Sequence, residues 1–142
     1  FREMAPDPSL LPDMVDGVPL RRVLETINDR IEYLIDREHR IGHAFFMGEG
    51  GADRRAVDRT MRDKVIPLLQ EYFFEDWGRV AAVLGERAEK GGAFLDCRKL
   101  SDPTANDGAV RYSWSVRDEF SPDAYDRLIG KVAQEPAAEL PA

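Results

Sequence analysis

The stretch LRRVLETINDRIEYLI, residues 20–35, decides the fold of this chain because its apolar residues recur at steps of three and four. This period places them on one face of an α-helix, while charged residues such as Arg22, Glu25 and Asp29 occupy the other face. The sequence therefore predicts a helix of about four turns that fades near residues 36–40. The apolar positions are Leu20, Val23, Leu24, Ile27, Ile31, Leu34 and Ile35.

A second apolar period extends from about residue 53 to residue 74. Asp53 precedes it and is the predicted N-cap, because its carboxylate can accept hydrogen bonds from the free N–H groups of a first turn. Pro67 lies inside the pattern, where a proline lacks a donor and its ring clashes with the preceding turn. We therefore expect a kink or a break between Lys64 and Pro67. The apolar face comprises Val57, Met61, Val65, Leu68, Leu69, Tyr72 and Phe73.

Three shorter elements complete the expected fold. A third helix carries Trp77, Val80, Val83 and Leu84 and ends at Gly85, since glycine readily takes the left-handed conformation that closes a helix. Apolar and polar residues then alternate over residues 112–116, which indicates a half-buried strand paired with residues 93–97. A last helix is expected to open at Ser121 as N-cap, with Pro122 at the first helical position. Its predicted apolar face comprises Tyr125, Leu128, Ile129 and Val132.

The expected fold class is mainly α (α+β), a helical bundle with a small β-hairpin at about residues 93–116. Four prolines make residues 1–19 an extended lead-in, and residues 20–133 then form one helical domain. Residues 41–47 are too apolar for a solvated loop, so we expect them to pack against the bundle and to be followed by a glycine-rich turn. Residues 134–142 are expected to be a flexible tail.

The composition is that of an ordinary globular domain. The chain has 142 residues, 33% of them charged, and a formal net charge of −7. This balance disfavours nucleic-acid binding, because such proteins neutralise phosphates with clustered lysines and arginines. No apolar run approaches the roughly 18 residues that span a bilayer, and the single cysteine, Cys97, excludes an internal disulfide. We expect a cytoplasmic protein without a membrane partner, and we interpret Phe1 as the cut edge of a longer chain.

The sequence lacks the motifs of a complete enzyme. The phosphate-binding pattern G-x-x-x-x-G-K-[ST] does not occur. His39 and His43 have the spacing of a helical zinc pair, but Arg40 stands where a zinc protease carries its general-base glutamate. No third ligand is evident, so we expect neither a metal site nor a catalytic residue in this chain.

In two segments the residue identities themselves, and not only the apolar spacing, are informative about the protein family. Residues 31–47 read IEYLIDREHRIGHAFFM, and residues 64–77 read KVIPLLQEYFFEDW. Both resemble the C-terminal region of McrB-type AAA+ NTPases, the nucleotide-driven subunit of a modification-dependent DNA restriction system. The family pattern is close to R-I…L-L-D-R-D-H-x-I-G-H-S-Y-F, followed by I-I-P-L-L-Q-E-Y-F-Y-x-D-W. This chain departs mildly from it, at Ile35, Glu38, Ala44 and Phe45. The resemblance is specific over about residues 27–84 and weak beyond them.

The resemblance implies a helical lid subdomain that follows a missing ATPase core. It implies GTP or ATP with Mg²⁺ as ligands of the intact protein, with none held by this fragment alone. The implied partners are the core, neighbouring subunits of a ring and a nuclease subunit. The nucleotide-sensing candidates are Ile41, Gly42, His43, Arg37 and Arg40, and the interface candidates are Tyr72, Phe73, Phe74 and Trp77.

Two interpretations of His43 stay open. In one, Gly42 lets the backbone approach the nucleotide or the core, and His43 forms a hydrogen bond there. In the other, His43 only ties two lid helices together. Likewise, residues 66–77 are expected to form core and subunit-facing surface rather than a ligand site.

Other functions are also compatible with the sequence. The chain could be a non-catalytic helical adaptor that docks a partner such as a nuclease. A DNA-binding domain is a third alternative, which the acidic balance disfavours.

Overall fold

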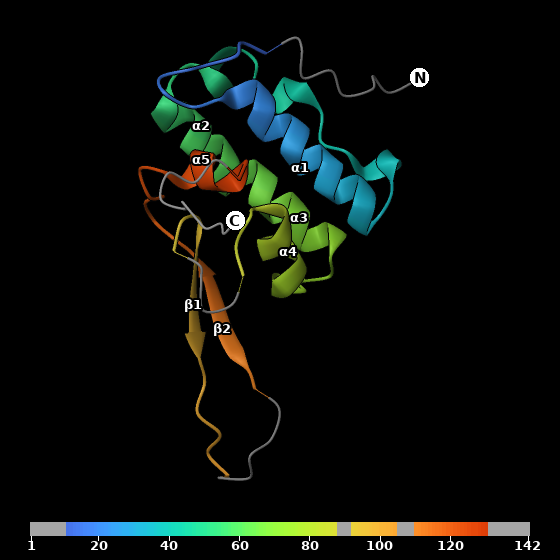
Figure 1. Ribbon diagram of the computed structural model, residues 1–142, viewed down its shortest axis with the longest axis vertical. Coiled ribbons are helices and arrows are strands. Elements are labelled where there is room, and N and C mark those ends of the chain that lie inside the picture. The colour runs from blue at the N-terminus through green and yellow to red at the C-terminus, as the bar shows by residue number, and fades with distance from the viewer. Residues whose placement is uncertain (1–10, 88–91, 105–109, 131–142) are drawn as a thin grey trace, which may run out of the picture.

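A computed structural model describes residues 11–87, 92–104 and 110–130 and shows a helical bundle with one β-hairpin (Figure 1). This confirms the mainly α fold class with a hairpin near the C-terminus. Three 3₁₀ helices, Arg37–His39, His43–Phe46 and Gly48–Gly51, connect α1 to α2. The named elements are α1 (Leu20–Leu34), α2 (Arg54–Thr60), α3 (Ile66–Tyr72), α4 (Trp77–Val83), β1 (Leu95–Lys99), β2 (Tyr112–Val116) and α5 (Ala124–Leu128).

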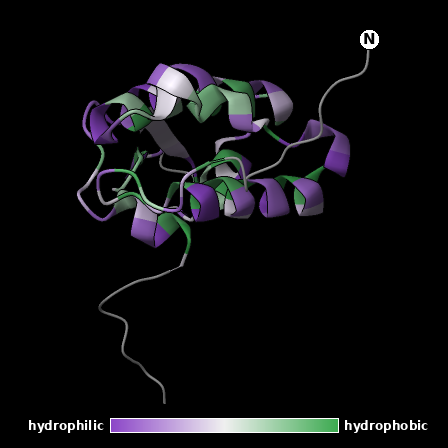
Figure 2. Cartoon of the chain, turned by 90° about the horizontal axis from the view of Figure 1, so that it is seen from above, coloured by the Kyte–Doolittle hydropathy of each residue, from purple (hydrophilic) through white to green (hydrophobic). Residues whose placement is uncertain are grey.

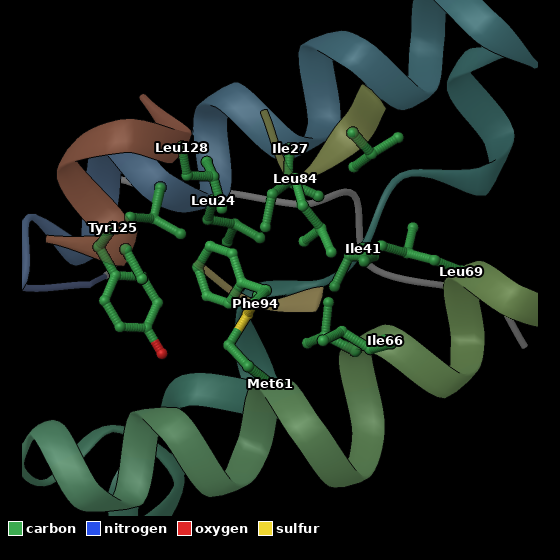
Figure 3. Close-up of a cluster of buried hydrophobic side chains, with 14 of the residues drawn as sticks. Leu24, Ile27, Ile41, Met61, Ile66, Leu69, Leu84, Phe94, Tyr125 and Leu128 are labelled. Carbon is green, nitrogen blue, oxygen red and sulfur yellow. The ribbon is translucent and has the colours of Figure 1, made fainter. Parts of the chain in front are cut away.

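The core lies between α1 and the other helices. Figure 2 shows the hydrophilic sides of the helices turned outward and their hydrophobic sides turned inward. Of the apolar positions predicted for α1, the five from Leu20 to Ile31 are fully buried, whereas Leu34 and Ile35 are half-buried at its end. Figure 3 shows Leu24 of α1, Met61 and Phe94 meeting in this core. The periodicity of residues 20–35 thus predicted the buried face correctly, because a helix of period 3.6 can bury one stripe.

The second long helix is present but its middle is widened. A π-helical turn, Met61–Val65, joins α2 to α3, and the Ile66 N–H donates to the carbonyl of Met61. Pro67 follows in the first turn of α3, where its missing N–H does little harm. The predicted irregularity is confirmed, although it lies just before the expected position. Asp53 is confirmed as the N-cap, since its side chain accepts a hydrogen bond from the Ala56 N–H at 2.8 Å.

The segment before α1 is more tightly bound than the predicted extended lead-in. Residues 1–10 lie outside the described residues, but residues 11–19 fold back on the bundle. Val15 and Val18 exchange backbone hydrogen bonds across a turn in which Asp16 and Gly17 both have positive φ. Such a turn closes a two-residue hairpin, and it directs Leu11 and Val18 into the core.

The last helix begins later than predicted. α5 starts at Ala124 with Asp123 before it, and Ser121 is not its N-cap. The Ser121 hydroxyl donates to the carboxylate of Asp123 at 2.8 Å, and the Ser121 carbonyl accepts from Arg54 at 2.9 Å. Both groups are therefore engaged in holding a turn. Of the predicted apolar face, Tyr125 and Leu128 are buried, Ile129 is half-buried after the helix, and Val132 lies outside the described residues.

The hairpin projects from the bundle as an arm (Figure 1). β1 and β2 pair antiparallel, with Leu95 opposite Val116 and Cys97 opposite Trp114. The hairpin is confirmed, and its first strand lies two residues later than the predicted 93–97. Its base is fixed by Phe94, which is fully buried and contacts the rings of Phe120 and Tyr125 at centroid distances of 4.8 and 5.2 Å. Within the part of the chain that is described, no helix is both long and apolar enough to cross a membrane.

Candidate functional site

A buried asparagine on α1 holds the segment that carries the nucleotide-sensing candidates. Asn28 is 5% exposed, and its side-chain amide donates to the carbonyl of Ile41 at 2.9 Å. The Ile41 N–H donates in turn to the Asn28 side-chain oxygen at 2.6 Å. One amide group thus satisfies both backbone groups of Ile41, as a neighbouring strand would. Because a buried backbone group without a partner costs about 1–3 kcal/mol, this pair of bonds fixes the path of the chain.

Gly42 is exposed between two buried neighbours. Ile41 is 1% and His43 is 5% exposed. The backbone of Gly42 is extended, with φ −74° and ψ 152°, which any residue can adopt. A Cβ built there would meet none of the described atoms within 4 Å. Nothing inside the described chain therefore requires a glycine at this position.

His43 faces the interior of the bundle. It lies in the 3₁₀ helix His43–Phe46, and its 5% exposure leaves little of the ring accessible from outside. Ligand contact by His43 and the alternative of a tie between lid helices both stay predictions. The burial shows that a ligand contact through this ring needs a movement of the surrounding segment.

Residues 41–43, which Asn28 holds through Ile41, are called the clamped segment below. Two arginines, Arg37 and Arg40, precede it and differ in how their side chains are held. The Arg40 guanidinium Nε donates to the carbonyl of Arg37 at 2.8 Å, so this side chain folds over its own turn. Arg37 itself is exposed, and its guanidinium meets no partner among the described residues. Arg37 is consequently the cation of the pair that is available to an anion.

Hydrogen bonds close the turn that carries Arg37. Asp36 accepts hydrogen bonds from the N–H of His39 at 3.0 Å and from its ring Nδ1 at 2.7 Å. The side-chain hydrogen bond from His39 lowers the pKa of this exposed carboxyl group. The His39 ring also contacts Tyr72 of α3 edge-on, at a centroid distance of 4.8 Å. This contact connects the 3₁₀ helix Arg37–His39 to the end of α3.

Two glycines, Gly50 and Gly51, pack closely against the backbone that follows residues 41–43. Gly50 and Gly51 lie so close to the carbonyl oxygens of Phe45 and Phe46 that a Cβ on either would overlap them. The Thr60 hydroxyl donates to the carbonyl of Gly50 at 3.0 Å and secures this packing to α2. The sequence predicted a glycine-rich turn here. The structure shows a 3₁₀ helix in which these two glycines permit a close backbone approach.

The four interface candidates divide by burial. Phe73 is 4% exposed and belongs to the core, whereas Phe74 is 91% exposed. Tyr72 and Trp77 are half-buried and pack against the core. Phe74 is thus the member of this set whose side chain is fully presented to a partner.

Asn28 is the site residue that the sequence reasoning missed. Its signal was present, since a polar residue follows Ile27 on the apolar face of a helix and must find a buried partner. No motif indicates which partner, because Ile41 lies thirteen residues away in the sequence. Across the described ranges, no three His, Cys, Asp or Glu residues gather into a possible metal site.

A comparison with protein families gives a match to part of the chain. Residues 19–81 match the family model described as McrB, alpha-helical lid domain. The matched span runs from the start of α1 into α4 and includes Asn28, the clamped segment and Phe74. The resemblance to an McrB-type helical lid is therefore confirmed over these residues. A comparison with curated proteins gives no match.

Proposed function

We propose, from the premise that residues 19–81 are an McrB-type helical lid, that this chain is the C-terminal lid of a nucleotide-hydrolysing AAA+ motor subunit. The motor would use GTP or ATP with Mg²⁺ and would serve a modification-dependent DNA restriction system. The observation that carries the proposal is the exposed Gly42, held by the Asn28–Ile41 hydrogen bonds between two buried residues.

The physical argument concerns close approach. A glycine that no internal contact requires leaves its backbone open to a group from outside the chain. The rigid connection to α1 means that such a group would meet a fixed surface rather than a moving loop. Arg37 lies five residues before Gly42 and offers a guanidinium group, which is suited to phosphate oxygens. Together they could report the presence of a nucleotide held by the core domain.

The lid supplies position rather than catalysis in this proposal. The nucleotide and Mg²⁺ would be held by an ATPase core outside this chain. Because the Asn28 clamp joins Gly42 to α1, movement of the surface near a bound nucleotide would move the whole bundle. That movement would link nucleotide state to contacts with neighbouring subunits of a ring.

A bulky side chain at Gly42 tests this proposal. In the intact protein, Gly42→Leu should lower nucleotide affinity by about tenfold or more, which corresponds to about 1.4 kcal/mol. The thermal unfolding midpoint should stay close to that of the wild type, because the extended backbone and open surroundings accept a side chain. Nucleotide affinity is measured by titration with a fluorescent GTP or ATP analogue, and hydrolysis by phosphate release.

Ala44→Leu is the matched control, because Ala44 is also exposed and lies two residues further along. Arg37→Ala should weaken nucleotide binding too, whereas Arg22→Ala, an exposed arginine on α1, should not. Unchanged affinity and hydrolysis in both Gly42→Leu and Arg37→Ala would contradict the sensing role. That result would favour the alternative of a helical adaptor module.

A further inference from the structure

The helix α3 ends in a turn that holds one aromatic side chain in solvent. The Phe74 N–H donates to the carbonyl of Glu71, and the Glu75 N–H donates to the carbonyl of Gln70. These two bonds form a Schellman motif, in which the residue after the C-cap is usually glycine. Here that residue is Phe74 with φ 52°, followed by Glu75 with φ 63°. An L-residue adopts this left-handed conformation against steric resistance, so the turn is strained.

The folded chain gains little from the Phe74 side chain. The ring is 91% exposed, so it contributes almost no burial to the core. A glycine at this position would remove both the strain and the exposed ring. An exposed aromatic group at a strained position fits a surface that a partner buries.

The surroundings of Phe74 are acidic. A hollow of about 480 Å³ lies beside the ring, lined by Phe74 with Pro67, Gln70, Glu71 and Glu75. The carboxylates of Glu71 and Glu75 form no ion pair with any residue that the structure describes. Two carboxylates without a cation therefore flank one exposed ring, and we call this surface the acidic hollow.

The nearby charges of the chain leave the acidic hollow uncompensated. Arg79 pairs with Asp76 at 3.6 Å, and Asp76 also accepts a hydrogen bond from the Arg79 N–H at 3.3 Å. This arginine is thus engaged by an acid that does not line the hollow. Lys64 precedes Pro67 on the same helical run and does not line the hollow either. The group that the hollow lacks is a cation supplied from outside.

We propose that the acidic hollow binds an arginine side chain presented by a basic segment of another protein. The guanidinium group would stack on the ring of Phe74 and pair with the carboxylates of Glu71 and Glu75. Arginine fits this surface better than lysine, because its planar group stacks on aromatic rings and binds carboxylates through two parallel N–H groups. Pro67 adds a rigid apolar wall to the hollow.

The charge of the chain favours a different protein over a second copy. The net charge of −7 makes two copies repel each other at long range, whereas a basic protein is attracted. The exposed arginines Arg55 and Arg59 share their own hollow with four carboxylates, so they do not complement an acidic surface. Nucleic acids are disfavoured as well, because their phosphates carry the same charge as Glu71 and Glu75.

The test uses the purified 142-residue chain and a synthetic peptide whose arginines are separated by glycine and serine. Binding is followed by the amide chemical shifts of the ¹⁵N-labelled chain, without nucleotide. The shifts should concentrate on residues 67–75, and the same peptide with lysines should bind more weakly. Glu71→Gln with Glu75→Gln should raise the dissociation constant at least tenfold. Phe74→Gly should also weaken binding while the chain stays folded.

Asp29→Asn with Glu32→Gln is the matched control, because it removes the same charge from two exposed acids on α1. This control should leave the affinity close to that of the wild type. Shifts spread over the whole acidic surface, or an equal loss of affinity in the control, would overturn the inference. Self-association of the chain that depends on Glu71 and Glu75 would overturn it too. The inference goes beyond the proposed nucleotide role, and none of these results would bear on sensing through Gly42.

Discussion

Two helix ends in this chain use the same hydrogen bonds but differ in the residue at the left-handed position. At the end of α4, the Gly85 N–H donates to the carbonyl of Ala82 and the Glu86 N–H donates to the carbonyl of Ala81. Gly85 has φ 80°. At the end of α3, the corresponding residues are Phe74 and Glu75. Each motif thus has a glutamate after its left-handed residue.

The surroundings explain the difference. A Cβ on Gly85 would lie 3.1 Å from the Cα of Leu128 and 3.2 Å from the carbonyl oxygen of Arg127, so α5 leaves no room for a side chain. Glu86 is 5% exposed and accepts hydrogen bonds from Phe94 and Ala93 at 2.6 and 3.5 Å. Packing against α5 therefore explains why the left-handed residue at the end of α4 is a glycine. The end of α3 faces solvent, so no contact within the described residues explains why its left-handed residue is Phe74.

The largest expected effect is at Gly85. Gly85→Ala should destabilise the chain by about 2–4 kcal/mol, because it combines left-handed strain with crowding against α5. Urea unfolding followed by circular dichroism measures the loss. A cost below about 1 kcal/mol would show that α5 moves away easily, and the contrast between the two ends would then weaken.

The second prediction is that the stability of the fold depends on pH through Glu86. Burial raises the pKa of this carboxyl group above its ordinary value of 4.5, against the effect of its hydrogen bonds from Phe94 and Ala93. An acid with a raised pKa in the folded state binds more protons than in the unfolded state. Its contribution to stability is therefore present at pH below about 4.5 and is lost as pH rises through the folded-state pKa.

Glu86→Gln removes this titration. The unfolding midpoint of the wild type relative to Glu86→Gln should fall as pH rises from about 4 to 8. Glu75→Gln, the exposed counterpart in the other motif, is the reference against which the slope is read. A constant difference between wild type and Glu86→Gln at all pH values would contradict the assignment to Glu86.

The smallest expected effect has the opposite sign. Phe74→Gly should stabilise the chain by about 0.5–1 kcal/mol, since relief of left-handed strain exceeds the added entropy of the unfolded state. Thermal unfolding of the chain measures this gain. Destabilisation would mean that the Phe74 ring supports the fold, and the functional explanation of its exposure would lose its basis.

Much of the fold could be predicted because it depends on local physics. The apolar period of α1, the Asp53 cap, the irregularity before Pro67 and the Gly85 terminus each follow from a few neighbouring residues. The predicted start of the last helix was wrong by a few residues, because α5 begins at Ala124. Ser121 has the chemistry of an N-cap, but its hydroxyl and carbonyl bind Asp123 and Arg54, and Arg54 lies 67 residues away.

The candidate site was predicted less completely. Residues 41–43 were identified by resemblance, and Gly42 lies exposed on the surface. The sequence did not indicate that Asn28 holds them or that His43 is buried. It also treated Phe73 and Phe74 as equivalent interface candidates. The α3 terminus separates them, because one continues the buried face and the next begins a left-handed turn.

The sequence by itself determined where the main helices and the hairpin lie, to within a few residues, and that the chain resembles an McrB-type lid. These properties depend on periodicity, caps and motifs, which act between residues close in the chain. Only the tertiary structure decided which polar groups are satisfied, which glycines are crowded and which aromatic ring is left outside. Those outcomes depend on contacts between distant segments, such as Asn28 with Ile41 and Gly85 with Leu128.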